Sequence, residues 1–365
     1  MAATNKVLLI GYGFQGEPGL ESLIEQGSFD VLSVVTPPYE IGRYRPVRPL
    51  ELPVERLAEE YKIPITRTNT ESDIQELVDR YKPESVLICV YNKIFSREIL
   101  ESGPSFYNIH HGDVPKWRGS SSSEWAVISG RNEITLTLHE VIPNLDSGDI
   151  FWQDRITITD EEDLRDMRRK MNDIIRRNLG LVYAHILHPE DWPQVRNSHD
   201  VYRREQKGKS SYTCSIREED ALIDWNKSAG EIYNLIRGLC DPVWGVPPAY
   251  TFYEGEKLTI LSSEIIKNPR SYVNEVVMGE WRIKYNCGIP GKPVQICKGE
   301  GVEVLTGDGT LLIKDVEYGG WGGNASEVLR SIRNTLGLHP KDLFEKISKL
   351  EARVIELSDR LDKPS

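Results

Sequence analysis

The sequence lacks the features that mark secreted, membrane-spanning and nucleic-acid-coating proteins. Its five cysteines are odd in number and include no close pair, so neither a disulfide framework nor a CxxC metal site is indicated. No apolar run approaches the ~18 residues of a membrane span, and the N-terminus shows no secretion signal, so we expect a cytoplasmic protein without a membrane partner. The net charge of -11 argues against binding nucleic acid through general electrostatics.

The length and composition fit a globular protein of about two domains. Of the 365 residues, 39% are hydrophobic and 28% are charged, which is enough apolar material for real cores. We expect a catalytic domain over residues 1–196 and a second domain over 213–322. A polar, unpatterned stretch predicts a linker over 197–212, and a helical tail is expected over 323–365.

The first half of the chain alternates strand and helix patterns. Buried-strand runs at residues 6–10, 31–35 and 85–90 are separated by helical periodicity. This order predicts an α/β fold with a Rossmann-like, mainly parallel sheet and helices on both faces. Ligands of such sheets bind at the carboxyl ends of the strands, so we look for the site there.

A glycine-rich turn follows the first predicted strand. Residues 11–16 read G-x-G-x-x-G, a spacing that is typical of dinucleotide-binding turns. The next strand, however, ends in Thr36-Pro37-Pro38 and lacks the acid that would hold a ribose hydroxyl. An NAD-dependent oxidoreductase is therefore an alternative, supported by the glycine-rich turn but not by the acid expected at the end of the next strand.

An amide, an imidazole and a carboxylate are combined between residues 108 and 146. Asn108 and His110 lie two positions apart in a predicted strand and share a face, while His111 points away. The turn at Asp146 can return a carboxylate to the end of that strand. Acyl transfer to an amine needs groups of these kinds, to hold an oxyanion and to take a proton. In the alternative without catalysis, Asn108 would hydrogen-bond within a turn and His110 would be a polar residue at the end of a strand.

These adjacent histidines also bear on a metal site. Because His110 and His111 face opposite sides of a strand, they cannot easily share one ion with His139 and Asp146. We therefore predict no bound metal.

Three motifs around these residues resemble those of the folate-dependent formyltransferase family. They are Asn-x-His at 108–110, Pro-Lys-Trp-Arg-Gly at 115–119 and Leu-Asp-Ser-Gly-Asp at 145–149. The family includes methionyl-tRNA, glycinamide ribonucleotide and sugar-nucleotide formyltransferases. The resemblance implies that Asn108, His110 and Asp146 catalyse formyl transfer from N10-formyltetrahydrofolate, as co-substrate, to a primary amine. His111 departs from the small residue or proline that is usual at its position.

The resemblance also implies where the pterin of the folate binds. It would lie between the segment after the third buried strand and the loop before Asp146, held largely through backbone groups. The residues implied are Lys93, Ile94, Phe95, Ile142, Pro143, Asn144 and Leu145. A pterin edge suits backbone donors and acceptors between apolar walls.

The same resemblance suggests residues for the acceptor site. They are Tyr12 and Gly13 of the glycine-rich turn, and His139. Arg43 and Arg45 are added because the proline-rich loop that carries them has a local positive face, which predicts an anion-binding flap over the acceptor, with solvated surface as the alternative. His139 favours a nucleotide-linked amino sugar, because the sugar-nucleotide and ribonucleotide enzymes carry histidine there, while the tRNA enzymes tend to carry methionine.

The charge favours the same acceptor. A protein that grips a tRNA backbone must neutralise several phosphates, and this chain is at -11. Methionyl-tRNA formyltransferase is the main alternative. A non-catalytic binding protein that keeps the fold is a further one.

The last third of the chain predicts a small sheet domain and a terminal helix. The segments at 222–225, 241–245 and 249–252 resemble the second domain of methionyl-tRNA and 4-amino-arabinose-type formyltransferases. Short strand patterns at 258–261, 282–285, 294–297, 302–306 and 311–316 favour an OB-like β-barrel. Apolar residues then recur at heptad spacing, namely Leu343, Ile347, Leu350, Val354, Leu357 and Leu361. Such a short coiled-coil-like helix needs a partner. We expect a homo-oligomer through it, with docking on its own barrel as the alternative.

Overall fold

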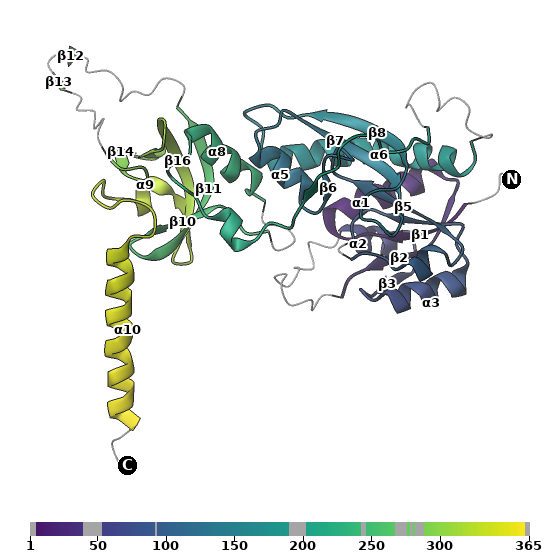
Figure 1. Ribbon diagram of the computed structural model, residues 1–365, viewed down its shortest axis with the longest axis horizontal. Coiled ribbons are helices and arrows are strands. Elements are labelled where there is room, and N and C mark those ends of the chain that lie inside the picture. Colours follow the sequence, from purple (N-terminus) through teal and green to yellow (C-terminus); the bar gives the residue numbers. More distant parts are fainter. Residues whose placement is uncertain are drawn as a thin grey trace. The chain divides into compact units, whose positions relative to one another are not determined.

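The computed structural model describes residues 5–38, 53–91, 93–189, 202–241, 246–266, 276–277, 280–281 and 288–361. The chain divides into two compact units, one built mainly from residues before Ser215 and one mainly from Ile216 onward (Figure 1). Within the described residues, no helix has both the length and the apolar character needed to cross a membrane.

A seven-stranded sheet organises the N-terminal unit, with the strand order β3-β2-β1-β4-β5-β7-β8. The strands are β1 (Asn5–Ile10), β2 (Phe29–Thr36), β3 (Ile65–Arg67), β4 (Ser85–Ile88), β5 (Ser105–His110), β7 (Glu133–Glu140) and β8 (Ile150–Thr157). The five strands from β3 to β5 pair in parallel, while β7 is antiparallel to both β5 and β8. This confirms the mainly parallel Rossmann-like sheet predicted from the sequence.

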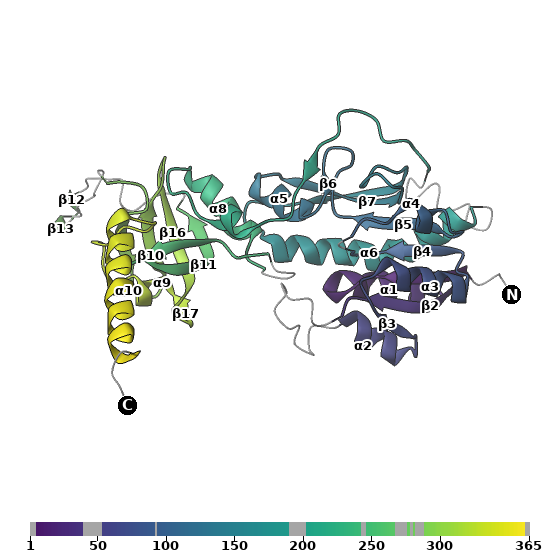
Figure 2. The ribbon, with the colours of Figure 1, turned by 60° about the horizontal axis from the view of Figure 1, so that its bottom comes forward.

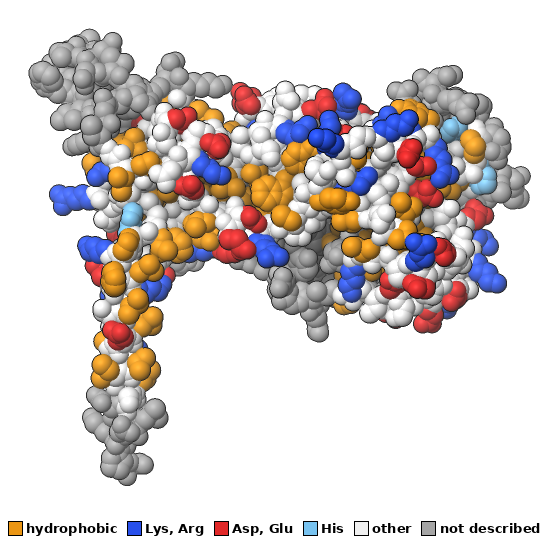
Figure 3. Space-filling view, in the orientation of Figure 1, with side chains coloured by type: hydrophobic (Ala, Val, Ile, Leu, Met, Phe, Trp, Pro, Cys, Tyr) orange, Lys and Arg blue, Asp and Glu red, His pale blue; other side chains and the backbone are white. Residues whose placement is uncertain are grey.

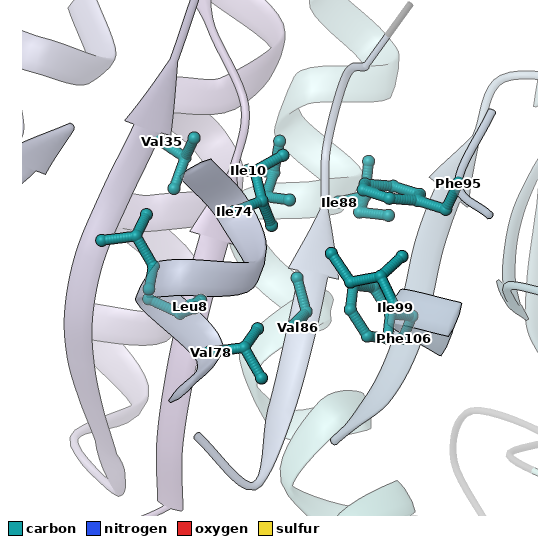
Figure 4. Close-up of a cluster of buried hydrophobic side chains, with 11 residues drawn as sticks. Leu8, Ile10, Val35, Ile74, Val78, Val86, Ile88, Phe95, Ile99 and Phe106 are labelled. Carbon is teal, nitrogen blue, oxygen red and sulfur yellow. The ribbon is translucent and has the colours of Figure 1, made fainter. Parts of the chain in front are cut away.

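Helices cover both faces of this sheet. They are α1 (Gly13–Gln26), α2 (Pro53–Glu60), α3 (Glu71–Tyr81), α4 (Arg97–Leu100), α5 (Ser122–Ile128) and α6 (Leu164–Leu187). On one face, Ile74 and Val78 of α3 join Leu8 and Ile10 of β1 in a buried cluster (Figure 4). The alternate β1 residue Leu9 is also fully buried, as expected for a strand covered on both sides.

Helices α1 and α6 pack closely against each other (Figure 2). Gly180 of α6 allows this approach, because a Cβ there would lie 2.2 Å from the carbonyl oxygen of Ser22 in α1. The backbone N–H of Gly180 donates to the Ser22 hydroxyl at 2.8 Å. Tyr183 of α6 donates its hydroxyl proton to Ser85 of β4 at 2.7 Å, which ties the helix pair to the sheet.

The glycine-rich turn has a packing explanation. A Cβ on Gly16 would lie 2.9 Å from the backbone of Gly11, and one on Gly19 would lie 2.4 Å from the Cys89 sulfur. These glycines therefore let α1 begin close against β1 and the residue that follows β4. The G-x-G-x-x-G spacing is accounted for by this close approach, without a dinucleotide.

A second, antiparallel sheet organises the C-terminal unit, in the region where the OB-like β-barrel is expected. Its order is β10-β11-β16-β15-β14, with β17 paired to β16. The elements of this unit are η2 (Glu218–Ala221), α8 (Ala229–Gly238), β10 (Tyr250–Tyr253), β11 (Glu256–Ile265), β12 (Val276–Val277), β13 (Glu280–Trp281), β14 (Pro293–Cys297), β15 (Gly301–Leu305), β16 (Thr310–Tyr318), β17 (Trp321–Asn324), α9 (Ala325–Val328) and α10 (Pro340–Leu361). The strand expected at 282–285 lies outside the described residues.

The helical tail begins later than the sequence pattern suggests. Residues 324–339 belong to the sheet unit, where Leu329 and Leu336 are buried at 0% and 2% exposure. The backbone N–H of Gly337 also donates to the carbonyl of Phe252 in β10 at 2.8 Å. The continuous helix with the heptad pattern is therefore α10, which starts at Pro340.

Candidate active site

Strand pairing brings the first two predicted catalytic residues to the site. Asn108 and His110 lie at the carboxyl end of β5, and Asn108 sits directly opposite His139 of β7. Asn108 Nδ2 is 3.2 Å from His139 Nε2. The β5–β7 register therefore fixes which imidazole supports the Asn108 amide.

Asp146 completes the cluster from the turn between β7 and β8. Its Oδ2 accepts a hydrogen bond from the backbone N–H of Gly119 at 2.7 Å and lies 3.7 Å from His110 Nδ1. Its Oδ1 lies 3.5 Å from His139 Nε2. Burial raises the pKa of Asp146, but the contacts with His139, His110 and the Gly119 amide outweigh it and lower that pKa to about 2. The carboxylate is thus charged and held between two imidazoles.

His110 is held in one orientation by the loop that follows its strand. Its Nε2 lies 2.6 Å from the Trp117 carbonyl oxygen, so Nε2 carries the proton that is donated there. Gly112 allows the loop to close over the ring, because a Cβ at this position would lie 2.5 Å from Nε2. Burial lowers the pKa of His110 despite the nearby charge of Asp146. The neutral ring therefore presents an unprotonated Nδ1 toward Asp146.

His111 faces away from the cluster, as its place in the strand predicts. Its Nδ1 lies 3.2 Å from the side-chain nitrogen of Gln15, near the start of α1. Burial, followed by electrostatic interactions with the neighbouring His110 imidazole and the Arg168 guanidinium, lowers the pKa of His111 to about 3. His111 is a neutral link between β5 and the glycine-rich turn. This arrangement gives no support to a metal site that uses both adjacent histidines.

The turn that carries Asp146 is supported by a residue that the sequence analysis did not single out. Gln206 donates from Nε2 to the carbonyl oxygens of Asp146 and Gly148, both at 2.8 Å. Its Oε1 accepts from the guanidinium of Arg118 at 2.8 and 3.1 Å. Nothing in the sequence marks Gln206, because it lies in a polar stretch without periodicity.

The stretch around Gln206 was expected to form the linker over 197–212. Residues 197–201 lie outside the described residues, and those from Tyr202 onward pack on the N-terminal unit. Strand β9 (Tyr212–Thr213) pairs in parallel with β6 (Arg118–Gly119), and Arg204 forms a bridge to Ile150. This segment is therefore part of the site's framework.

The residues predicted to bind the acceptor do not form one group in the structure. His139 is only 1% exposed and contacts Asn108 and Asp146, so its side chain supports these residues and has no face left for an acceptor. Tyr12 precedes α1 and Gly13 opens it with φ 57°. Arg43 and Arg45 lie outside the described residues.

The segments implied for the pterin flank one apolar cluster. The Phe95 ring lies 5.4 Å from that of Phe106 in β5, and Tyr91 and Val141 pack against the same cluster. The Phe95 side chain is buried in this core, so only its backbone can reach a ligand. Ile94 and Leu145 are 62% and 39% exposed and offer apolar surface. This pattern fits a flat heterocycle bound by backbone groups.

Comparisons with known proteins agree with the geometry. Residues 6–179 match the family described as formyl transferase, and residues 215–333 match its C-terminal domain. The chain belongs to the folate-dependent formyltransferase family. Two relatives are the methionyl-tRNA formyltransferases of Caldanaerobacter subterraneus subsp. tengcongensis and Malacoplasma penetrans. Both are 30% identical, over 72% and 84% of this chain and 82% and 88% of their own lengths.

Solved structures share the fold at low identity. The N-formyltransferase from Helicobacter canadensis, in complex with folinic acid and dTDP-3-aminofucose, superimposes with a TM-score of 0.54 at 16% identity, covering 85% of this chain and 98% of that chain. HypX from Aquifex aeolicus, in complex with tetrahydrofolic acid, gives 0.54 at 15% identity, covering 90% of this chain and 48% of that chain. This chain therefore spans about half of the length of HypX.

Family membership decides between the broad alternatives. The chain is therefore an enzyme of formyl transfer, in a family whose co-substrate is N10-formyltetrahydrofolate. The NAD-dependent oxidoreductase and the non-catalytic binding protein are both set aside by this assignment. The family predicted from the motifs at 108–149 is therefore confirmed.

The neutral state of His111 predicts a dependence of stability on pH. Its folded pKa of about 3 lies below its ordinary value of 6.5, so below pH 6.5 the unfolded chain binds a proton that the folded chain does not. The free energy of unfolding should therefore fall from pH 6.5 toward pH 3, by at most about 1.4 kcal/mol per pH unit from this group. Urea unfolding at pH 7, 6 and 5 should show a flatter dependence for His111→Leu than for the wild type. Equal slopes would contradict the assignment.

Proposed function

We propose that Asn108, His110 and Asp146 carry out the formyl transfer. The acceptor amine attacks the formyl carbon, a C–N bond forms, and the carbonyl electrons move onto oxygen to give a tetrahedral oxyanion. The Asn108 amide is placed to donate to this oxyanion, because its nitrogen is already oriented by His139. Collapse of the intermediate breaks the bond to N10 of the folate, which leaves as tetrahydrofolate after N10 takes up a proton.

The proton taken from the amine has a defined destination in this proposal. His110 holds its own proton on Nε2 against the Trp117 carbonyl, so Nδ1 is the nitrogen that can accept another. Asp146 lies 3.7 Å from that nitrogen and stabilises the imidazolium that forms. His110 then returns the proton to the leaving N10. The observation that supports the proposal most directly is that the neutral His110 imidazole lies beside the charged Asp146 carboxylate.

Removing any of the three side chains should lower turnover strongly. We expect Asn108→Ala, His110→Ala and Asp146→Ala to lose about a hundredfold to a thousandfold in kcat, the typical effect of deleting one oxyanion donor or its equivalent. Asp149→Ala is the matched control, because Asp149 lies in the same turn and pairs with Arg203 outside the cluster. Near wild-type kcat in a folded triad variant would show that the assigned role is wrong.

We propose that the acceptor is the amino group of methionyl-tRNA. The support is the set of relatives that carry this activity in their names and match both domains over most of their own lengths, up to 94% for the enzyme of Prochlorococcus marinus at 28% identity. In the sequence, His139 and the net charge of -11 favour a nucleotide-linked amino sugar. The relatives favour the tRNA alternative, and the burial of His139 removes the main residue-level argument for the sugar.

A nucleotide-linked amino sugar is the second candidate. The net charge of -11 favours it, since a polyanionic acceptor needs local basic surface. The structural likeness to a sugar N-formyltransferase shows the shared fold only, at 16% identity. Both candidates present a primary amine to the same donor and the same three side chains.

One assay separates the two acceptors. The enzyme should formylate methionyl-tRNA in the presence of N10-formyltetrahydrofolate, and KM for the tRNA should rise steeply with salt as phosphate contacts are screened. The matched reactions contain dTDP- and UDP-linked 3-amino and 4-amino sugars, and uncharged tRNA is the control. Efficient turnover of a sugar nucleotide without formylation of the tRNA would reverse the choice while leaving the donor and the three catalytic residues in place.

We also propose that the chain forms a homo-oligomer through α10. Seven described apolar side chains of this helix are 44% to 69% exposed, namely Leu343, Phe344, Ile347, Leu350, Val354, Ile355 and Leu357. A monomer would keep this surface in water at a cost of about 25 cal/mol for each Å² that a partner could cover. The alternative of a helix docked on its own sheet domain does not account for this exposure.

A further inference from the structure

The exposed face of α10 carries a specific pattern of branched and unbranched side chains. Hydrophobic side chains run along the helix (Figure 3). In heptad positions, Ile347, Val354 and Leu361 occupy a, so two of the three a residues are β-branched, while Leu343, Leu350 and Leu357 occupy d. β-Branched residues at a with leucine at d favour two parallel strands over trimers and tetramers. Three heptads are marginal as a free helix in water, so the pairing would also stabilise the helix itself.

The charges beside this face distinguish parallel from antiparallel pairing. Lys346 and Arg353 occupy g, and Glu351 occupies e. In a parallel, in-register pair, Lys346 meets Glu351 of the partner subunit, and the contact occurs twice by symmetry. In an antiparallel pair, Lys346 would instead lie near Arg353 of the partner subunit and the two would repel.

One intramolecular contact competes with this arrangement. Lys346 Nζ lies 3.0 Å from a carboxylate oxygen of Glu256 in β11, and both side chains are more than half exposed. Exposed ion pairs of this kind contribute little to stability, so Lys346 can exchange Glu256 for a new carboxylate.

We propose that two copies of this chain pair through α10 as a parallel, in-register, two-stranded coiled coil. The exposed apolar face of α10 would therefore pack against the same face of α10 in a second copy of the chain. This inference rests on the self-association proposed for the chain, and it adds the number of strands, their direction and their register. Phe344, at position e, widens the buried seam at its N-terminal end.

Disulfide trapping tests the direction of the helices in the full-length protein. A parallel pair places each d position beside its own copy, so Leu343→Cys chains should link to one another under mild oxidation, and Leu357→Cys chains should do the same. A mixture of the two variants should give no mixed link above background. Preferential formation of the mixed Leu343–Leu357 link would overturn the parallel arrangement, because only an antiparallel pair brings those positions together.

Two controls separate this inference from self-association itself. Ser348→Cys places a thiol on the exposed outer side of the same helix and should link no faster than the unsubstituted chain, whose Cys214 is also exposed. Sedimentation of a chain ending at His339 should show a monomer, whereas the full-length chain should show a dimer. A dimer of the shortened chain would contradict self-association through α10, whereas a full-length trimer or tetramer would contradict only the two-stranded pairing.

A second and independent observation concerns the backbone of Asp146. Its φ of +46° lies in the left-handed region, which a non-glycine residue adopts at a cost. The turn is held there by Gln206, which donates to the carbonyls of Asp146 and Gly148. Arg118 in turn fixes Gln206 through two hydrogen bonds to Oε1. The neighbouring Gly119 N–H binds the Asp146 carboxylate directly.

We infer that Gln206 is a positioning residue for formyl transfer. It acts through Asp146, by holding the turn in the conformation that sets the carboxylate between His110 and His139. The inference rests on the catalytic role proposed for Asp146. Because Gln206 contacts this turn at Asp146 and Gly148, and not at the residues 142–145 implied for the donor, it is expected to affect turnover and to leave the affinity for donor and acceptor nearly unchanged.

A double-mutant cycle tests this role. Gln206→Leu should lower kcat by about ten- to a hundredfold with KM nearly unchanged, in the range that a displaced catalytic group costs. In an Asp146→Asn background, the same substitution should cause little further loss. Glu205→Leu is the matched control, because Glu205 is exposed and adjacent. An equal fold loss in both backgrounds would overturn the inference, and full activity of Asp146→Asn would instead contradict the catalytic role of Asp146.

Discussion

The candidate active site depends on keeping one buried carboxylate, that of Asp146, charged. Asp146 is mostly buried, and burial alone would favour its neutral form. The imidazoles of His110 and His139 and the backbone N–H of Gly119 offset this cost, and they come from three different strands of the N-terminal unit: β5, β7 and β6. The sheet register, the closure of the loop over His110 and the Gln206 contacts all serve to bring these groups within reach. Much of the local architecture follows from that requirement.

The sequence predicts the parts of this site that obey short-range rules. Asn108 and His110 share a face because strand residues alternate, and their motif context identifies the family. The position of Asp146 in a turn is equally visible. The Trp117 carbonyl, the Gly119 amide and Gln206 could not be predicted, since backbone groups carry no residue identity and Gln206 depends on a long-range contact. The burial of His139 also depends on a long-range contact, its cross-strand pairing with Asn108. The sequence alone therefore suggests an acceptor role for His139 that its burial does not support.

Segment boundaries are less visible in the sequence than the segments themselves. The alternating pattern of the first half and the short strands of the second half follow from side-chain periodicity, and both sheets are present. The polar stretch before Tyr212 resembled a linker because it has no periodicity, yet it hydrogen-bonds along β6 and the Asp146 turn. The heptads of α10 were visible in the sequence. Its first residue was not, because residues 324–339 pack on the sheet domain through irregular contacts.

The two ends of the turn that bears Asp146 differ in how well they tolerate substitution. At Gly148, any side chain would place its Cβ 2.1 Å from the carbonyl oxygen of Glu140, so this end of the turn tolerates no substitution without moving the backbone. Residues 143–145 at the other end are exposed. Laboratory evolution could therefore reshape the wall proposed to face the donor, and so alter which folate derivatives are accepted, while the Asp146 carboxylate keeps its place.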